Sequence, residues 1–393
     1  MNTIIGELGK SNKFVDLSKQ IEKTQSPISI SGLTGVGMAE IIASIKGYNK
    51  KPILLVTYNE IQAKRMLENI KAFETENVVL FPKKEIVTYD YVAESKDLPY
   101  ERIETLNKIN EKKNLIVVTT IEAIMQKLPS KQVLFKDVLE FKIGDICNLE
   151  DIKRKLVNLG YSRYDLIEGR GQFSIRGGII DISLDEKIGV RIELWGDEID
   201  SIRNFSISSQ RSINTLEKAK IYPAHEYVLE DSIENICKKI SKTIADGKQE
   251  EIIEQDIEQI KAGNYISKID KYFNEFFEKQ ETLIDYLNKN CLIFLDEVSK
   301  VEQRQLNILQ DIENLSKNLI EKEKVIPEAL SIIESIDVDV LENKHQIIYF
   351  LFLVILLIFL LFLLYQPLYK YFFSLCSIFL YLQKSFLFHF YNN

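Results

Sequence analysis

The chain has 393 residues, of which 46% are apolar, and a formal net charge of −8. It is long enough for two or three domains with their own cores, but too acidic to bind duplex nucleic acid by bulk electrostatics, because phosphate contacts need clustered Lys and Arg. The four cysteines are far apart, with no CxxC pair and no close histidines. This spacing indicates no metal site and favours a reducing cytoplasm.

A glycine-rich turn follows the first apolar run, between a predicted strand and a predicted helix over 38–45. It reads Gly32, Leu33, Thr34, Gly35, Val36, Gly37, Met38, Ala39. A phosphate-binding loop has the pattern GxxxxGK[ST], so Met38 and Ala39 replace the lysine and the hydroxyl residue. Neither can contact the β/γ-phosphates with charge or help to hold magnesium. The sequence predicts a degenerate nucleotide loop, no hydrolysis and no cofactor; a simple strand-to-helix turn is the alternative.

Short apolar runs then alternate with helical stretches as far as residue 128. We expect strands at 52–57, 78–81 and 115–120, and a helix at 60–72. These apolar runs are continuous rather than alternating, which is typical of a parallel sheet covered on both faces. The predicted fold class is therefore α/β.

The pattern changes near residue 146, where an inserted module is expected to continue to residue 225. A helix over 154–159 can end at Gly160, and strands follow. The apolar phase flips at Gly177-Gly178, which we interpret as a glycine bulge within one strand. In the next strand, Arg191, Glu193 and Trp195 alternate with apolar residues, and Gly196-Asp197 predicts a turn before 199–205.

Helices are predicted again at 232–245, 250–260 and 302–325. Between them an apolar strand over 291–295 ends in Asp296 and Glu297. Two acids at this place are typical of a Walker B element, in which one orients magnesium and the other polarises water. Acids that only serve the structure at a strand end are the alternative. For His225 we expect no catalytic or metal role, because no second histidine or cysteine lies at ligand spacing.

Several of these segments together resemble the N-terminal, UvrB-like module of the bacterial transcription-repair coupling factors (Mfd). The resemblance covers about residues 1–340 and depends on the segments 32–39, 80–90, 160–163, 169–182, 196–203, 209–211 and 223–226. Excinuclease subunit UvrB shares this layout but keeps a complete phosphate-binding loop. Met38 and Ala39 therefore favour the coupling factors.

The resemblance implies a helicase-like (RecA-like) domain, formed by residues 1–145 and 226–344, that is interrupted by a small α+β UvrB-interaction domain at 146–225. In that family the insert recruits UvrA, whereas the DNA-translocating motor and the RNA-polymerase-binding domain lie beyond the matched part. The expected function is thus a non-catalytic module of nucleotide excision repair, which contacts DNA indirectly or weakly. An ATP-dependent, UvrB-type repair enzyme is the alternative.

Five residues of the insert are candidates for the contact with UvrA. Arg163 and Arg176 match positions of the family's UvrA-binding surface. Arg170, Arg191 and Trp195 are added because arginine and tryptophan are common anchors of protein interfaces. In the alternative interpretation, each arginine only pairs with a neighbouring acid.

The last part of the chain is strongly apolar. Residues 347–365 form an uninterrupted run that could cross a bilayer as a helix, which would make the chain a membrane-anchored binding protein. From residue 345 onward there is no Gly, Ala, Thr, Asp, Glu or Arg. That composition is typical of translation in a shifted reading frame. We therefore hypothesise that the authentic sequence ends near Lys344 and that 345–393 is a frameshift product or a membrane segment.

Overall fold

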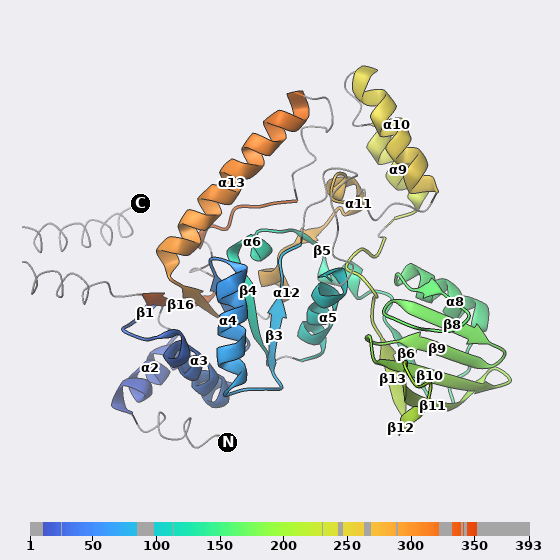
Figure 1. The fold of residues 1–393 in the computed structure, drawn as a ribbon, viewed down its shortest axis with the longest axis horizontal. Helices are drawn as coiled ribbons and strands as arrows, with labels where there is room; N and C mark the ends of the chain where they lie inside the picture. The colour runs from blue at the N-terminus through green and yellow to red at the C-terminus, as the bar shows by residue number, and fades with distance from the viewer. Residues whose placement is uncertain are drawn as a thin grey trace, which may run out of the picture.

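The computed structural model describes residues 11–24, 26–84, 98–112, 114–229, 231–242, 247–262, 269–287, 290–321, 332–338, 341 and 344–351. Within them, a parallel sheet with covering helices forms one body, and an antiparallel sheet forms a second body beside it (Figure 1). Part of the segment at 80–90 that supports the family resemblance, including Tyr89 and Asp90, lies outside the described residues.

The first body is built on a six-stranded sheet with the order β1-β16-β15-β2-β4-β3, in which every pairing is parallel. Every residue of the two strands at its centre, β2 and β15, is buried, as the continuous apolar runs predict. The strands are β1 (Ile28–Ser31), β2 (Ile53–Thr57), β3 (Val78–Phe81), β4 (Ile116–Thr120), β15 (Leu292–Asp296) and β16 (Gln346–Leu351).

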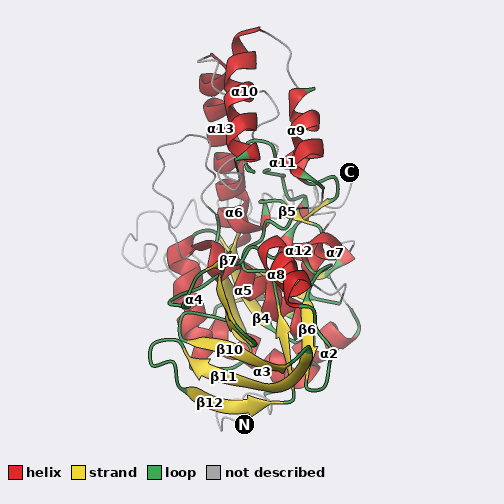
Figure 2. Ribbon diagram, turned by 90° about the vertical axis from the view of Figure 1, so that its right-hand side faces the viewer, coloured by secondary structure: helices red, strands yellow, loops and turns green. Residues whose placement is uncertain are grey.

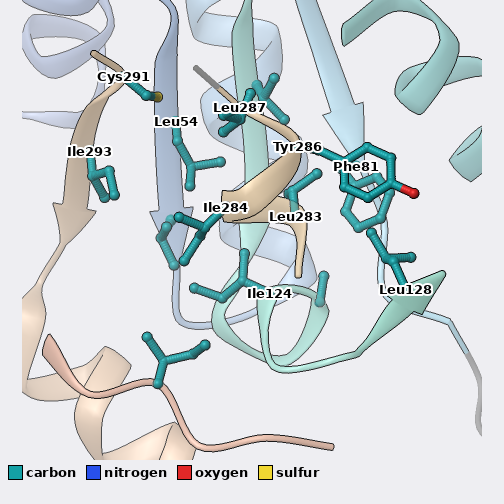
Figure 3. Packing of buried hydrophobic residues seen from close by; sticks show 14 of the residues in the cluster. Leu54, Phe81, Ile124, Leu128, Leu283, Ile284, Tyr286, Leu287, Cys291 and Ile293 are labelled. Atoms are coloured by element: carbon teal, nitrogen blue, oxygen red, sulfur yellow. The ribbon is translucent and has the colours of Figure 1, made fainter. Parts of the chain in front are cut away.

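Helices cover both faces of this sheet, and successive residues of β2 point to opposite cores. Ile53 and Leu55 pack with one set of helices, while Val56 and Leu54 pack with the other. Figure 3 shows Leu54 in this second core. The first set is α2 (Asn12–Glu22), α3 (Gly35–Asn49) and α4 (Glu60–Lys71). The second is α5 (Leu98–Glu111), α6 (Ile121–Ile124), α12 (Leu283–Tyr286) and α13 (Val298–Glu321). The predicted α/β class is confirmed.

Strand β16 overturns the expectation that the folded body stops at Lys344. Gln346–Leu351 lies between β1 and β15 and pairs with both. Ile348 and Phe350 are at most 1% exposed, and the Phe350 ring stacks on Phe294. The start of the run at 347–365 is thus a strand and not the helix that the sequence predicts. The prediction fails here because a short apolar run can belong either to a fully buried strand or to a helix. The rest of that run, and the whole tail from 352 to 393, lies outside the described residues.

The second body, the insert, is an antiparallel sheet that carries one helix. Its strand order is β12-β11-β10-β9-β8-β7, where the short edge pair β7–β8 is parallel. The elements are α8 (Leu149–Asn158), β7 (Ser162–Arg163), β8 (Gln172–Arg176), β9 (Ile179–Ser183), β10 (Ile188–Trp195), β11 (Glu198–Ser206) and β12 (Ser212–Leu216).

A two-stranded ladder closes the insert at its base. Strand β6 (Leu139–Lys142) pairs antiparallel with β13 (Lys218–Ile221). Phe141 and Ile221 belong to the core of the insert, together with Phe173 and Ile192. The insert therefore begins at residue 139 and not at the predicted residue 146, because β6 completes its core.

The phase flip at Gly177-Gly178 is a hairpin turn, so the predicted bulge within one strand is wrong. β8 and β9 pair antiparallel from Phe173↔Ile182 to Arg176↔Ile179. Gly177 has a φ of +59°, the left-handed backbone that the tight turns between antiparallel strands require. Two glycines between apolar runs fit both a bulge and a hairpin, and only the pairing partners distinguish them. The predicted turn at Gly196-Asp197 is confirmed, since it joins β10 to β11.

The chain between the insert and β15 forms a small helical group. Helices α9 (Ile233–Ser241), α10 (Gly247–Lys261) and α11 (Phe273–Phe276) share a core of isoleucine and aromatic side chains. α9, α10 and α13 lie at the end of the molecule away from β12 (Figure 2). The short elements β5 (Leu128–Pro129), α7 (Lys131–Leu134) and β14 (Gln280–Glu281) complete the described chain, in which no helix is both long and apolar enough to span a bilayer.

Candidate functional site

The glycine turn at 32–37 leads from β1 into α3, where a phosphate-binding loop would lie. Gly32 has a φ of +81°, and Thr34 caps the helix by accepting the Gly37 N–H on its hydroxyl at 3.4 Å. The Met38 N–H donates to the Thr34 carbonyl at 2.9 Å. In a working loop the free amides at this helix end face a phosphate. Here one of them, the Gly37 amide, bonds within the turn, whereas the Met38 bond is the first i→i−4 bond of the helix.

Met38 and Ala39 point into the protein. They are 5% and 0% exposed and belong to the core between the sheet and helices α2 to α4. The positions that a lysine and a hydroxyl residue would hold are thus occupied by core side chains. At these two positions the turn offers neither the charge nor the hydroxyl that a phosphate-binding loop presents to a nucleotide and its metal ion.

The two acids of the Walker B-like element lie at the end of the apolar strand, as predicted: Asp296 is the last residue of β15 and Glu297 follows it. Their surroundings differ. Asp296 is completely buried and accepts one hydrogen bond, from Gln62 Nε2 to Oδ2 at 2.7 Å. Its Oδ1 has no partner among the described residues. Burial raises the pKa of Asp296, an effect that the Gln62 bond opposes and the neighbouring charge of Glu297 reinforces. Glu297 itself pairs with Lys300 at 2.7 Å.

The insert presents a charged sheet face organised by one buried acid. Asp181 is 1% exposed. Its two oxygens accept from Arg191 Nε at 2.6 Å, Arg191 Nη2 at 2.9 Å and Arg176 Nη2 at 2.9 Å. The Arg191 guanidinium also lies over the Phe205 ring, 4.5 Å from its centre. Hydrogen bonding to Asp181 raises the pKa of Arg191, so this arginine is charged and fixed in place.

Arg176 is the more accessible arginine of this pair. Its side chain is 48% exposed against 17% for Arg191. A second ion pair, Arg203 with Glu193, lies on the neighbouring strands of the same sheet. We call Arg176, Asp181, Arg191, Glu193 and Arg203 the arginine face.

The other three predicted contact residues lie in different places. Trp195 is 84% exposed at the end of β10. Arg163 is exposed on the edge strand β7. Arg170 is mostly buried and faces helix α5 across a cavity that Tyr100 and Asn107 also line. The sequence grouped all five arginine and tryptophan residues, but the structure brings only Arg176 and Arg191 together.

His225 lies where the chain leaves the insert, just beyond β13. Its ring packs against Gly160, and its Nδ1 accepts the Tyr227 N–H at 3.2 Å. Burial lowers the pKa of His225 to about 4. Among the described residues, no group of three or more histidine, cysteine or acidic side chains could hold a metal ion.

The residue of the arginine face that binds both Arg176 and Arg191, and that the sequence did not single out, is Asp181. It follows the apolar residues Ile179 and Ile180 and has the position of a core residue. A strand-pairing argument could have found it, since Asp181 lies opposite Arg191 in the register of β9 and β10. Opposite charges at such a pair stabilise a sheet.

Comparison with known proteins agrees with this arrangement. Residues 139–227 match the UvrB interaction domain family, and these bounds coincide with the insert from β6 to just beyond β13. The chain is also 30% identical over 369 residues to the transcription-repair-coupling factor of Bacillus subtilis (strain 168), covering 90% of this chain and 31% of that protein.

The chain is a relative of the transcription-repair coupling factors. It is also 28% identical over 360 residues to the coupling factor of Staphylococcus epidermidis (strain ATCC 35984), covering 88% of this chain and 30% of that protein. For the coupling factor of Staphylococcus aureus (strain bovine RF122), the identity is 27% over 333 residues, with 82% and 28% covered. The chain thus spans about a third of the length of the coupling factors it matches.

Proposed function

We propose that this chain is a non-catalytic binding module that recruits UvrA in nucleotide excision repair, in the cytoplasm. The observation that carries the proposal is the arginine face of the insert, which lies within the segment that matches the UvrB interaction domain. Arg176 and Arg191 share one buried acid and are therefore held ready, so a partner need not bear the entropic cost of ordering them.

The proposed contact surface includes this face and two further exposed side chains of the insert. Trp195 and Arg163 are accessible and belong to residue types that anchor protein interfaces. Arg170 is left out, because it faces the cavity beside α5. We expect direct DNA contact to be weak, since the net charge of −8 opposes phosphate binding. We assign no RNA polymerase contact to the described residues.

The test is capture of purified UvrA by the full chain. We expect Arg163→Ala with Arg176→Ala to weaken capture by at least about tenfold, because truncation of an arginine at an interface hot spot costs ~2 kcal/mol or more. Arg154→Ala is the matched control, since Arg154 lies on α8 of the same insert and is 74% exposed. Equal capture by the double variant and the wild type would remove the proposed contact.

A UvrB-type ATP-dependent enzyme is the second candidate, and the turn at Gly32 to Gly37 argues against it. Titration of the chain with ATP and magnesium should show no saturable binding in the micromolar range. Steady phosphate release that Glu297→Gln abolishes would instead support the enzyme and contradict the non-catalytic module.

A further inference from the structure

The chain leaves the insert through a short segment, 224–228, whose side chains enter three different cores. Ala224 still belongs to the core of the insert. Tyr227 belongs to the core of the helical group formed by α9, α10 and α11, and Val228 belongs to a core of the first body. Because successive Cα atoms lie about 3.8 Å apart, at most about 11 Å of chain separates Ala224 from Tyr227. The insert therefore cannot move far from the first body without moving Tyr227.

Glu226, in the middle of this segment, is bound to helix α5 of the first body. In Figure 1 the chain passes beside α5 on its way from the insert to α9. Glu226 is 1% exposed, and both of its carboxylate oxygens accept from Arg102 Nε at 3.1 Å. Arg102 Nη1 also donates to Gln126 Oε1 at 3.2 Å. Gln126 in turn holds the backbone of Lys84, since its Oε1 accepts the Lys84 N–H at 2.8 Å and its Nε2 donates to the Lys84 carbonyl at 2.6 Å.

Lys84 continues this chain of hydrogen bonds into the helical group. Its Nζ pairs with Asp270, which lies just before α11, and it also contacts the Tyr227 hydroxyl. The same Nζ lies over the Tyr227 ring, 4.6 Å from its centre. The side chains of Lys84 and Asp270 are only 12% and 6% exposed. Removal of one partner of such a pair is strongly destabilising, because it leaves the other charge buried and uncompensated.

We propose that this segment and its polar partners act as a coupling joint, through which the insert and the helical group loosen from the first body together. The coupling joint consists of residues 224–228, Lys84, Arg102, Gln126 and Asp270. A partner that pulls the insert away from α5 breaks the Arg102–Glu226 pair and, over so short a tether, draws Tyr227 out of the helical group. Groups that share one hydrogen-bond network are energetically coupled, so the effect also runs in the other direction.

The coupling joint has a consequence for the surface of the helical group. The core that Tyr227 helps to fill also contains Tyr272, Phe273, Phe276 and Phe277. Withdrawal of the Tyr227 ring uncovers these aromatic side chains, so displacement of the insert opens an apolar surface at a distance from it. This inference is independent of UvrA recruitment, because any displacement of the insert operates the joint.

The experiment is native-state hydrogen exchange of the full chain, which measures local opening region by region. Two regions are compared: helix α9 of the helical group and the ladder β6–β13 at the base of the insert. Glu226→Gln, outside the helical group, should speed exchange in α9 by at least about threefold, the lower end of coupling within such a network. Asp270→Asn, outside the insert, should speed exchange in the ladder to a similar extent. The proposal is overturned if each substitution affects only its own region.

Asp256 provides the matched control, because it is a second buried acid of the helical group with a lysine and a tyrosine partner. It accepts from Lys271 Nζ at 2.6 Å and from the Tyr272 hydroxyl at 2.8 Å, both within the group itself. Asp256→Asn should therefore speed exchange in α10 but leave the ladder β6–β13 at the wild-type rate. If it speeds the ladder as much as Asp270→Asn does, the effect is a general loss of stability and the joint is refuted.

A milder variant serves if Asp270→Asn disturbs folding, as circular dichroism would reveal. Tyr227→Phe keeps the ring in the core and removes only the hydroxyl that contacts Lys84. It should speed exchange in both α9 and the ladder. Wild-type exchange rates in both regions of this variant, together with wild-type rates in α9 of Glu226→Gln, refute the joint.

Discussion

The two sheets of this protein each bury one aspartate, and they treat it in opposite ways. Asp296 in the parallel sheet is 0% exposed and has one amide partner. Asp181 in the insert is 1% exposed and accepts three hydrogen bonds from two arginines. A buried charge is expensive unless it is paired. The two sheets thus differ in how far each compensates the charge it buries: Asp181 is paired with two cations, whereas Asp296 is held by one neutral amide.

The largest expected effect tests the seam between the two bodies. Arg102 of α5 is 1% exposed, and its Nε donates to both oxygens of Glu226, just after the insert, at 3.1 Å. Arg102→Met leaves Glu226 buried and unpaired, so the free energy of unfolding in urea should fall by about 3–5 kcal/mol. A second substitution, Glu226→Gln, should restore part of the lost free energy of unfolding. Lys108→Met on the same helix is the control. If Arg102→Met lowers the free energy of unfolding no more than this control does, the Arg102–Glu226 pair does not hold the two bodies together.

The next effect depends on pH and concerns His225. Its pKa is lowered to about 4 in the folded chain, against about 6.5 when unfolded. The unfolded state therefore takes up a proton first as the pH falls. Stability should decrease from pH 6.5 towards pH 4, by roughly 2 to 3 kcal/mol in total. Urea titrations at pH 7 and pH 5 measure this, and His225→Gln should flatten the dependence. If the stability of the variant depends on pH as steeply as that of the wild type, other titrating groups cause the pH dependence.

A smaller effect is expected when the arginine face loses its organising acid. Asp181→Asn removes the charge that holds Arg176 and Arg191, so stability should fall by about 1.5–3 kcal/mol. UvrA capture should weaken as well, although Asp181 is too buried to touch a partner. Glu193→Gln is the control within the same face and should cost less, because Glu193 is partly exposed. If the Asp181→Asn variant keeps its stability and captures UvrA normally, Arg176 and Arg191 do not depend on the charge of Asp181 for their positions.

The smallest effect is expected at the other aspartate, and it has the opposite sign. Burial raises the pKa of Asp296, so its ionised form destabilises the fold as the pH rises above the unfolded pKa. Asp296→Asn should therefore stabilise the chain at pH 7, on the order of 1 kcal/mol. The gain should vanish near pH 3, where the carboxyl is protonated in both states. A destabilised variant at pH 7 would mean that the charge of Asp296 is compensated, and the contrast with Asp181 would be lost.

The elements that the sequence predicted well are those whose signal is local. The apolar run at Ile53–Thr57 and helix α4 depend on neighbouring residues and form close to the predicted bounds. α8 ends near Gly160 as predicted, but it begins at Leu149, about five residues before the predicted start. β16 was mistaken for a tail because its role depends on partners more than 50 residues away along the chain, in β15, and on β1 near the other end. Apolar composition alone cannot separate such a strand from a helix.

In the candidate site, too, the features set by neighbouring residues were predictable and those set by distant contacts were not. The residues Met38 and Ala39 are visible in the turn motif, but their burial in the core is known only from the structure. The grouping of Arg176 with Arg191 depends on the pairing of β8, β9 and β10 through Asp181. The separation of Arg170 from them depends on how the insert packs against α5. Neither can be deduced from residue types without the three-dimensional contacts.

The ladder between β6 and β13 has one more consequence. Leu139 lies opposite Ile221, so the two chain crossings that join the insert to its host run side by side, about 5 Å apart. Because its two ends lie side by side, such a domain can be removed and the host chain closed with a short linker. It can also be inserted into another protein that offers two neighbouring chain ends. This geometry makes the insert a transferable cassette.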